Sequence, residues 1–174
     1  TNLLNTHQLT SQDIAKIELR FAEAGAHCVD DNPLKGHSAQ YILPVRAAMG
    51  RLSYLDLFID RRDTDPEVAR LAVSAGVIRD QGEFDARFPD FYVGEVILTL
   101  ADGKVVSETS EIARGYPEQP LSQDDLDAKF AELAGCVADD ARTTALISAI
   151  KGLGEEQSVD ALAAQLSSPP NAPV

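Results

Sequence analysis

Hydrophobic and polar positions alternate in two parts of the chain and predict strands there. In residues 14–21 apolar residues alternate with charged ones, which is the pattern of a strand with one exposed face. Residues 94–100 and 104–112 flank Asp102-Gly103, a dipeptide typical of a tight turn, and therefore predict a β-hairpin. The second hairpin strand is the more polar of the two, which predicts a position toward the edge of the sheet.

A helical period predicts two helices between these strands. The segment from Gly36 to Gly50 reads as a loop followed by a helix that is apolar on most sides, so we expect this helix to be buried. The tripeptide Asp-Pro-Glu at residues 65–67 predicts a second helix start, because Asp is a good N-cap, Pro fits the first turn and Glu favours the helix dipole. We expect this second helix to end at Gly76, before a short edge strand at residues 77–79.

Other segments carry weaker patterns. Ser53 and Asp56 have the spacing of a capping box and predict a short helix through Phe58. Residues 22–35 and 80–90 are rich in turn formers or polar residues, so we expect irregular surface segments there. Three leucines near the start have no partner in the neighbouring sequence, and we expect them to form exposed apolar surface: Leu3, Leu4 and Leu9.

The last third of the chain predicts helices only. After a linker with two prolines, Ser122 begins one helix, residues 141–153 form a second and Ser158 caps a third. In the second we expect the buried side chains to be Leu146, Ile147, Ile150 and Leu153. Each helix has about one apolar stripe, and a segment of this size has a thin core by itself. We therefore expect these helices to pack on a larger helical domain or partner.

The predicted fold class is α+β. Residues 1–117 form a domain with a small sheet, a β-hairpin and packed helices. Residues 118–168 form the C-terminal helical segment, and residues 169–174 form a tail that we expect to be disordered.

Composition excludes several classes of partner. The chain has 174 residues, of which 44% are hydrophobic, and can bury a real core. Its formal net charge of −13 opposes binding to nucleic acid or to an anionic membrane. No apolar run approaches the ~20 residues of a membrane span, and the sequence starts without a signal-peptide pattern. Cys28 and Cys136 are isolated, so we expect free, buried thiols and a reducing compartment, the cytoplasm.

The motifs of the sequence are compatible with acid–base catalysis or substrate binding. The sequence has no phosphate-binding loop, nucleophile elbow or metal-ligand cluster. His37, Gln40 and Tyr41 are spaced so that a helix would point them the same way, toward a substrate. In the alternative interpretation, His37 caps the helix and Tyr41 forms a hydrogen bond at the edge of the core. The neighbouring His27 and Cys28 are a catalytic pair only if the imidazole reaches the thiol.

Lys35, Arg46 and Arg51 are candidate partners for a carboxylate, although such cations are usually solvated at the surface. Arg46 lies about five residues beyond Tyr41, roughly 140° round a helix axis, and therefore points elsewhere. Lys35 and His37 both lie in the loop and can share Tyr41's direction. We predict that Lys35 and His37 form the cationic end of the site, and that Arg46 and Arg51 serve packing or a partner chain.

The ordered motifs resemble those of the MmgE/PrpD family, which includes 2-methylcitrate dehydratase and cis-aconitate decarboxylase. The first resembles the family's HxxQY segment, and the others resemble its closing signature. The matching segments are residues 36–52, 102–103, 115–122 and 126–130. The sequence departs from the family pattern at Tyr116, where His is common, and at Gln119, where Asn is common.

The resemblance implies a fold and a chemistry. Members of the family eliminate water or carbon dioxide from small tricarboxylates, or epimerise or hydrate related acids, without a metal or organic cofactor. Their active site lies between a large helical domain and a smaller α+β lid that contributes the HxxQY segment. The resemblance therefore implies that His37 and Tyr41 are catalytic and that Gln40 helps them to bind the substrate, together with Lys35.

The resemblance also implies a partner, because the match begins deep inside the family's sequence. A larger helical chain or domain would carry the remaining catalytic groups. We rank a small subunit or a fragment of an oligomeric, cytoplasmic lyase or isomerase ahead of a non-catalytic binding or regulatory module derived from the lid. Elimination, decarboxylation and isomerisation all stay open as reactions.

Overall fold

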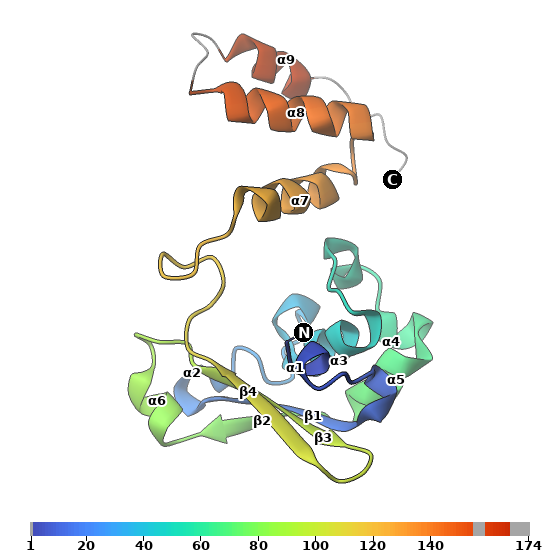
Figure 1. Ribbon diagram of the computed structural model, residues 1–174, viewed down its shortest axis with the longest axis vertical. Coiled ribbons are helices and arrows are strands. Elements are labelled where there is room, and N and C mark those ends of the chain that lie inside the picture. Colours follow the sequence, from blue (N-terminus) through green and yellow to red (C-terminus); the bar gives the residue numbers. More distant parts are fainter. Residues whose placement is uncertain (1, 155–158, 168–174) are drawn as a thin grey trace. The chain divides into compact units, whose positions relative to one another are not determined.

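The computed structural model describes residues 2–154 and 159–167, and the chain divides into two compact units, Thr1–Gln119 and Pro120–Val174. The first unit holds a sheet with its helices, and the described part of the second holds helices only (Figure 1). The predicted cap Ser158 and the predicted tail 169–174 lie outside the described residues. The fold is therefore α+β, as predicted.

Four strands form one mixed sheet in the order β2-β1-β3-β4. The central strand β1 pairs in parallel with β2 and antiparallel with β3, and β3 pairs antiparallel with β4. The strands are β1 (Ile14–Ala22), β2 (Ala75–Asp80), β3 (Gly94–Leu100) and β4 (Val105–Ser110). The predicted strands, the hairpin and the edge position of its second strand are thereby confirmed.

The helices of the first unit lie mostly in the crossover from β1 to β2. They are α1 (Asn2–Thr6), α2 (Glu23–Ala26), α3 (Ala39–Met49), α4 (Arg61–Thr64), α5 (Pro66–Val73) and α6 (Glu83–Arg87), with 3-10 turns η1 (Ser11–Asp13), η2 (Lys35–His37) and η3 (Tyr54–Leu57). Local signals explain several boundaries. Asp65 accepts hydrogen bonds from the backbone NH groups of Glu67 and Val68 at 2.9 and 3.2 Å and so begins α5. Gly76 does not end α5, as we expected, because α5 ends at Val73 and Gly76 lies within β2.

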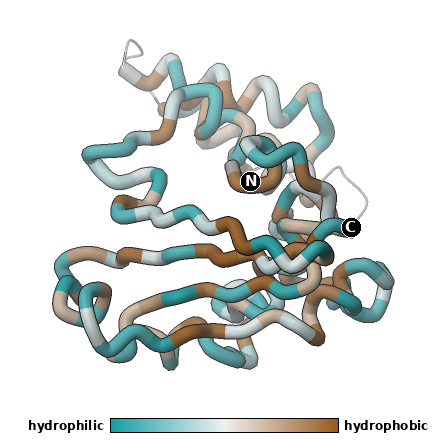
Figure 2. The backbone as a smooth tube through the Cα atoms, turned by 60° about the horizontal axis from the view of Figure 1, so that its bottom comes forward, coloured by the Kyte–Doolittle hydropathy of each residue, from teal (hydrophilic) through white to brown (hydrophobic). Residues whose placement is uncertain are grey.

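The main core lies between one face of the sheet and helices α1, α3 and α5 (Figure 1), and hydrophobic residues alternate with hydrophilic ones along much of the chain (Figure 2). Ile17 on β1 and Leu98 on β3 are paired and buried in this core. Leu3 is 6% exposed in the same core, and Leu4 and Leu9 pack against it. The expectation of exposed leucines at the start was wrong, because their partners are distant strands that the neighbouring sequence does not reveal.

The opposite face of the sheet is more polar. Arg20 on β1 bridges Asp80 on β2 and Glu95 on β3. Helix α6 covers one end of this face through Phe84, which is buried with Ala22 and Val93. Residues 22–35 and 80–90 are therefore less irregular than we expected, since α2 and α6 lie within them.

The second unit contains α7 (Gln123–Ala134), α8 (Asp140–Gly152) and α9 (Asp160–Ser167). Ser122 and Asp125 form the predicted capping box at the start of α7. Leu146 is buried on α8, whereas Ile150 and Leu153 remain exposed instead of buried as predicted. The reason is the thin core of a small helical unit, which cannot cover every apolar side chain.

Candidate functional site

The candidate site begins where the chain enters α3. Residues Lys35–His37 form the 3-10 turn η2, and the backbone NH of Ala39 donates to the carbonyl of Val29 at 2.8 Å, which fixes the start of the helix. Gly50 ends α3 with a φ of 67°, a left-handed conformation that suits glycine. The predicted helix is thereby confirmed, but His37 lies outside it.

Gln40 has a structural set of hydrogen bonds. Its side-chain amide donates to the carboxylate of Asp30 at 2.7 Å and accepts from the backbone NH of Asp31 at 3.0 Å. Arg79 on β2 also pairs with Asp30, at 2.8 Å. Gln40 therefore ties α3 to the preceding loop rather than pointing the same way as His37 and Tyr41.

Tyr41 is the most completely engaged of the predicted site residues. It is 1% exposed, and its hydroxyl donates to the carbonyl of Asp56, lies 3.0 Å from the carbonyl of Ile59 and accepts from the NH of Arg61 at 3.2 Å. Burial raises the pKa of this hydroxyl. Tyr41 therefore fastens the segment 53–62 to α3, as in the alternative interpretation of a tyrosine bonded at the edge of the core.

Asp56 is a fully buried carboxylate inside that segment. It accepts from the NH of Ser53 at 2.7 Å, from Arg61 Nε at 2.6 Å and from Arg51 Nη1 at 3.2 Å. Burial alone would raise its pKa, but the hydrogen bonds from Ser53 and Arg61 and the charges of Arg61 and Arg51 hold the pKa below its usual value. Arg51 thus forms an ion pair within the chain, and its predicted role in packing or in binding a partner chain stays a prediction.

Two cations lie over the ring of Tyr41. Lys35 Nζ is 5.7 Å and Arg62 Cζ is 5.4 Å from the ring centroid. The hydrogen bonds of Arg62 to Asp60 lower the pKa of that carboxyl to about 2, and the charge of Lys35 contributes. Lys35 also makes a long hydrogen bond, 3.5 Å from Nζ to the carbonyl of Phe58.

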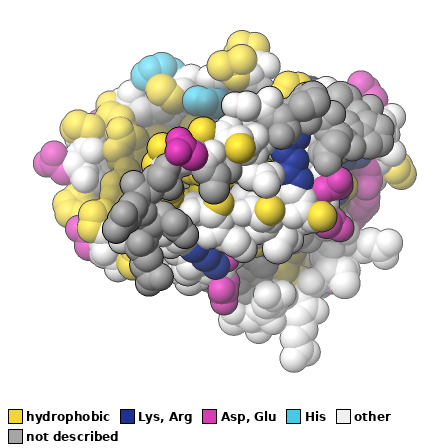
Figure 3. Space-filling view, turned by 90° about the horizontal axis from the view of Figure 1, so that it is seen from above, with side chains coloured by type: hydrophobic (Ala, Val, Ile, Leu, Met, Phe, Trp, Pro, Cys, Tyr) yellow, Lys and Arg dark blue, Asp and Glu magenta, His cyan; other side chains and the backbone are white. Residues whose placement is uncertain are grey.

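His37 lines a cavity of about 240 Å³ next to η2. Leu19, Ile42 and Leu43 contribute to the apolar lining, whereas Lys35 does not line this cavity. The His37 side chain is exposed, and Figure 3 shows histidine side chains at the molecular surface. This cavity offers an apolar space with one acid–base group at its edge.

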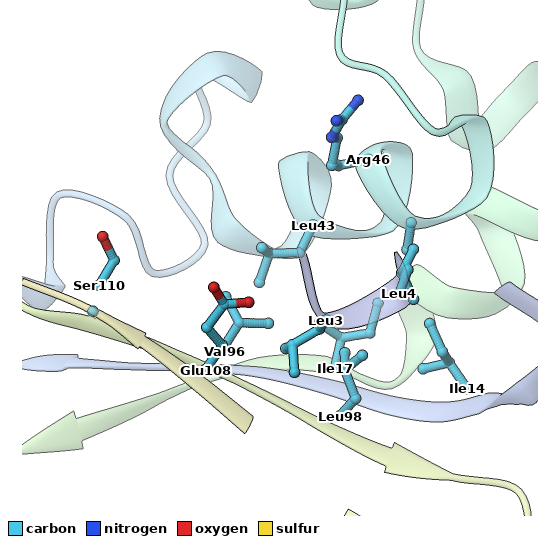
Figure 4. Close-up of a pocket in the computed structure, with 12 residues that line it drawn as sticks. Leu3, Leu4, Ile14, Ile17, Leu43, Arg46, Val96, Leu98, Glu108 and Ser110 are labelled. Carbon is cyan, nitrogen blue, oxygen red and sulfur yellow. The ribbon is translucent and has the colours of Figure 1, made fainter. Parts of the chain in front are cut away.

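A second cavity, larger than the one at His37, lies between α1, α3 and the sheet and has a volume of about 330 Å³ (Figure 4). Its floor is apolar, while Glu108 and Ser110 project into it from β4. Arg46 lines the rim, but its guanidinium points away from the strands and donates to the carbonyl of Gly50. Glu108 would repel an anion in this cavity, whereas the residues that line the cavity at His37 include no acidic side chain.

His27 and Cys28 do come together in space. The distance from His27 Nε2 to Cys28 Sγ is 3.4 Å, and both side chains are exposed. The expectation of a buried thiol was therefore wrong for Cys28, while Cys136 is half-buried. Among residues 2–154 and 159–167, no three His, Cys, Asp or Glu side chains gather in a way that could hold a metal ion.

The structure thus brings Lys35 beside Tyr41 and separates both from Gln40. The sequence interpretation missed Asp56, Arg61 and Arg62 as neighbours of Tyr41. The capping spacing of Ser53 and Asp56 located the turn, but no local pattern revealed that two nearby arginines turn back onto Asp56 and the tyrosine.

Comparison with known proteins gives one assignment. The chain matches no curated protein significantly. None of the helices in the described ranges has the length and apolar character needed to cross a membrane. The family model for the MmgE/PrpD C-terminal domain matches residues 1–153, which is most of the chain and includes the whole candidate site. The chain therefore belongs to the MmgE/PrpD family.

Proposed function

We propose that this chain supplies the substrate-binding half of a cofactor-independent lyase or isomerase that acts on small di- or tricarboxylic acids. The observation that carries this proposal is the turn Lys35–His37, which presents two basic side chains in a chain with a net charge of −13. The side chain of His37 makes no hydrogen bond or ion pair with any residue in the described part of the chain, and that of Lys35 makes a long one. Both therefore remain available to a carboxylate.

His37 is the proposed catalytic group, because an imidazole at the edge of a cavity can exchange a proton with a bound acid. Lys35 is the proposed charge partner of a substrate carboxylate. Tyr41 and Gln40 stay predicted site residues, but each would have to exchange its present hydrogen-bond partners before contacting a substrate.

The match to a C-terminal domain supports a partner for this chain. We propose that a larger helical chain or domain carries the remaining catalytic groups and that the assembly is oligomeric. Co-purification from the native source, followed by mass determination, identifies that partner. The cytoplasmic location stays a prediction from the two isolated cysteines.

Titration of the full chain with citrate, followed by NMR of the histidine rings, tests the carboxylate site. We expect the His37 signals to shift saturably, while those of His7 and His27, which are also exposed, stay in place. Lys35→Ala should raise the dissociation constant about tenfold, or about 1.4 kcal/mol. The effect should be larger at low salt, because the charge interaction is partly screened.

Arg46→Ala is the matched control for Lys35→Ala, since Arg46 lies on the same segment but its guanidinium binds the carbonyl of Gly50. We expect Arg46→Ala to leave citrate affinity within about twofold of the wild type. Weaker binding in Arg46→Ala together with unchanged binding in Lys35→Ala would show that the carboxylate site is misplaced.

A non-catalytic binding module is the second candidate function. One observation favours it: the side chains of both Gln40 and Tyr41 are engaged in structural hydrogen bonds. In the assembly with the co-purified partner, His37→Ala should lower turnover about 10²-fold or more if His37 is an acid–base group. Normal turnover in this variant would instead assign the chain a binding or regulatory role.

A further inference from the structure

A third cavity, of about 130 Å³, lies at the open end of the β3–β4 hairpin. The pairing of Gly94 with Ser110 ends the hairpin there and brings the segment before β3 next to the segment after β4. We call this cavity the aromatic–acidic pocket, and the residues of its lining that matter here are Asp90, Phe91, Tyr92, Glu111, Tyr116 and Glu118. None of them belongs to the site around His37.

The local backbone holds the second segment in place. The NH of Gly115 donates to the carbonyl of Gln119 at 2.8 Å, and the NH of Gln119 donates to the carbonyl of Tyr116 at 2.9 Å. Gly115 has a φ of 104°, which a residue with a side chain rarely adopts. This tight turn presents the ring of Tyr116 at the pocket.

The aromatic rings of the pocket are about half exposed. Phe91, Tyr92 and Tyr116 have exposed fractions of 46, 52 and 47%. Tyr92 is anchored by an edge contact with the ring of Phe88, at a centroid distance of 5.2 Å. The ring of Tyr92 is therefore held from one side, and all three residues remain partly accessible to solvent.

One cation already binds at this pocket from within the chain. Arg87 lies 5.0 Å from the ring centroid of Phe91 and forms two contacts of 3.1 Å with the carboxylate of Glu111. Its guanidinium thus satisfies one ring and one carboxylate of the lining. A guanidinium group can therefore bind between an aromatic ring and a carboxylate on this surface.

Two carboxylates of the pocket have no such partner. Asp90 and Glu118 are exposed and make no hydrogen bond through their side chains and no ion pair within residues 2–154 and 159–167. The Arg87–Glu111 pair is neutral, so Asp90 and Glu118 are the remaining charges among the residues that line the pocket. An anion would be repelled here, and the dispersed carboxylates do not form a metal-binding group among the described residues.

Aromatic faces together with carboxylates favour an organic cation, because the ring quadrupole and the negative charge both attract it. The volume corresponds to about four water molecules at about 30 Å³ each, which suits a single head group rather than a whole polar metabolite. We propose that the aromatic–acidic pocket binds an alkylammonium or guanidinium head group against Tyr92 and Tyr116, with Asp90 and Glu118 as its counter-charges.

Titration of the full chain with choline, at constant ionic strength and followed by NMR of the tyrosine rings, tests this proposal. The signals of Tyr92 and Tyr116 should shift saturably, while those of Tyr54, an exposed tyrosine on η3, should not. The control ligand is 3,3-dimethylbutan-1-ol, which has the same shape without the charge and should bind more weakly. Equal binding of the neutral alcohol, or equal shifts at Tyr54, would overturn the proposal.

Two variants separate the contributions of ring and charge. Tyr116→Leu should weaken choline binding about two- to fivefold, the range of a cation–ring contact at an exposed site. The double variant Asp90→Asn/Glu118→Gln should weaken it at least as much, and more at low salt. Because both carboxylates are exposed, the double variant tests the proposal even if Tyr116→Leu perturbs folding, which circular dichroism reports. Unchanged affinity in the double variant would contradict the proposal.

A second titration distinguishes the source of the head group. Choline represents a free small cation, and N-acetylarginine amide represents a basic side chain of another protein. The ligand that binds more tightly at Tyr92 and Tyr116 identifies the source of the head group. Tighter binding of either ligand supports the proposal. Binding of neither ligand up to about 100 mM would overturn it, since even a dissociation constant of this size corresponds to little more than one cation–ring contact.

Discussion

Tyr41 illustrates how one side chain joins two parts of the candidate site. It extends from α3 to the carbonyls of Asp56 and Ile59 and to the NH of Arg61. Without that hydroxyl, at least one buried carbonyl of the segment 53–62 would lose its partner. Removing this one oxygen atom should therefore lower the free energy of unfolding markedly.

Tyr41→Phe should lower the free energy of unfolding by about 1–3 kcal/mol, the cost of a buried polar group left without a hydrogen bond. Urea denaturation of the full chain measures the change. Tyr92→Phe is the control, because its hydroxyl is exposed and unbonded within the described residues, and it should change the value by less than about 0.5 kcal/mol. Equal free energies of unfolding in the two variants would show that the hydroxyl of Tyr41 does not stabilise the fold.

At the residue scale, the spacing located polar side chains at the start of α3 but did not reveal where they point. A polar group at the start of a buried helix is recognisable from spacing, and Lys35, Gln40 and Tyr41 all make contacts there. The direction of each depends on how the helix is rotated against the sheet, which helical periodicity alone does not specify. Arg62 and Asp56 were missed because their roles depend on contact with Tyr41, far away in sequence.

At the scale of elements, α5 is held to the start of β1 by one arginine. Arg70 Nη1 donates to the carbonyl of Ile14 and Nη2 to that of Ser11, both at 2.9 Å. Glu67, one turn earlier on α5, binds the same guanidinium at 2.7 and 2.8 Å and orients it. The link between helix and strand therefore depends on the charge of Glu67.

This link predicts a dependence of stability on pH. The hydrogen bond to Arg70 lowers the pKa of Glu67 from 4.5 to about 2. A carboxyl with a lowered folded-state pKa adds stability that is complete above about pH 4.5 and is lost as the pH falls toward 2. Glu67→Gln should therefore be less stable than the wild type at pH 7, by less than about 1 kcal/mol because the pair is partly exposed.

Urea denaturation between pH 7 and pH 2.5 measures this effect. The difference between wild type and Glu67→Gln should shrink as the solution becomes more acidic. Glu118→Gln serves as the control, since Glu118 is exposed and unpaired among the described residues. A constant difference across the whole range would mean that the charge of Glu67 does not act through Arg70.

Packing at α2 gives a second prediction for an element. A Cβ atom on Gly25 would lie 2.8 Å from ring atoms of both Phe21 and Phe88, which are packed edge to face. Gly25→Ala should therefore lower the free energy of unfolding by about 1–3 kcal/mol through overpacking. Gly76→Ala, on the edge strand β2 with open space around it, is the matched control and should be neutral or slightly stabilising. Thermal melts that rank the variants in the opposite order would refute this packing.

Elements with local signals were predicted well from the sequence. The capped starts at Asp65 and Ser122 and the turn at Asp102-Gly103 depend on interactions within about four residues. The burial of Leu3 was not predictable in this way, because its partners lie on strands that follow much later. The strand order was equally hidden, since parallel pairing of β1 with β2 leaves no mark in either strand alone.

At the scale of the whole molecule, apolar side chains remain exposed in both units. In the first unit they gather on and beside η3, where Leu55, Phe58 and Ile59 are exposed. The exposed apolar side chains of the second unit include Leu133, Val137 and Leu166. Exposed apolar surface of this kind favours association with another chain or domain.

The isolated chain should therefore bind a hydrophobic dye and associate in sedimentation experiments. Leu55→Ser/Phe58→Ser should reduce dye fluorescence and lower the free energy of unfolding by about 1 kcal/mol at most, because both side chains are largely exposed and Phe58 contacts the ring of Tyr54 only by its edge. Val73→Ser, a single exposed valine at the end of α5, is the control and should leave the fluorescence nearly unchanged. A dye-silent monomer with a cooperative melt would argue against an unpartnered surface.

The parallel pair of β1 and β2 has a consequence for the order of folding. Pairing of Ile17 with Ala75 must wait until the whole crossover from α2 to α5 has been brought together, whereas β3 and β4 are joined by a short turn. Closing the longer loop costs more chain entropy, so we expect the hairpin to form first and the β1–β2 pair late. Turn η2, helix α3 and turn η3 all lie inside that crossover. The pocket around His37 should therefore appear only after the hairpin, and a chain caught at that earlier stage would have two paired strands without a site.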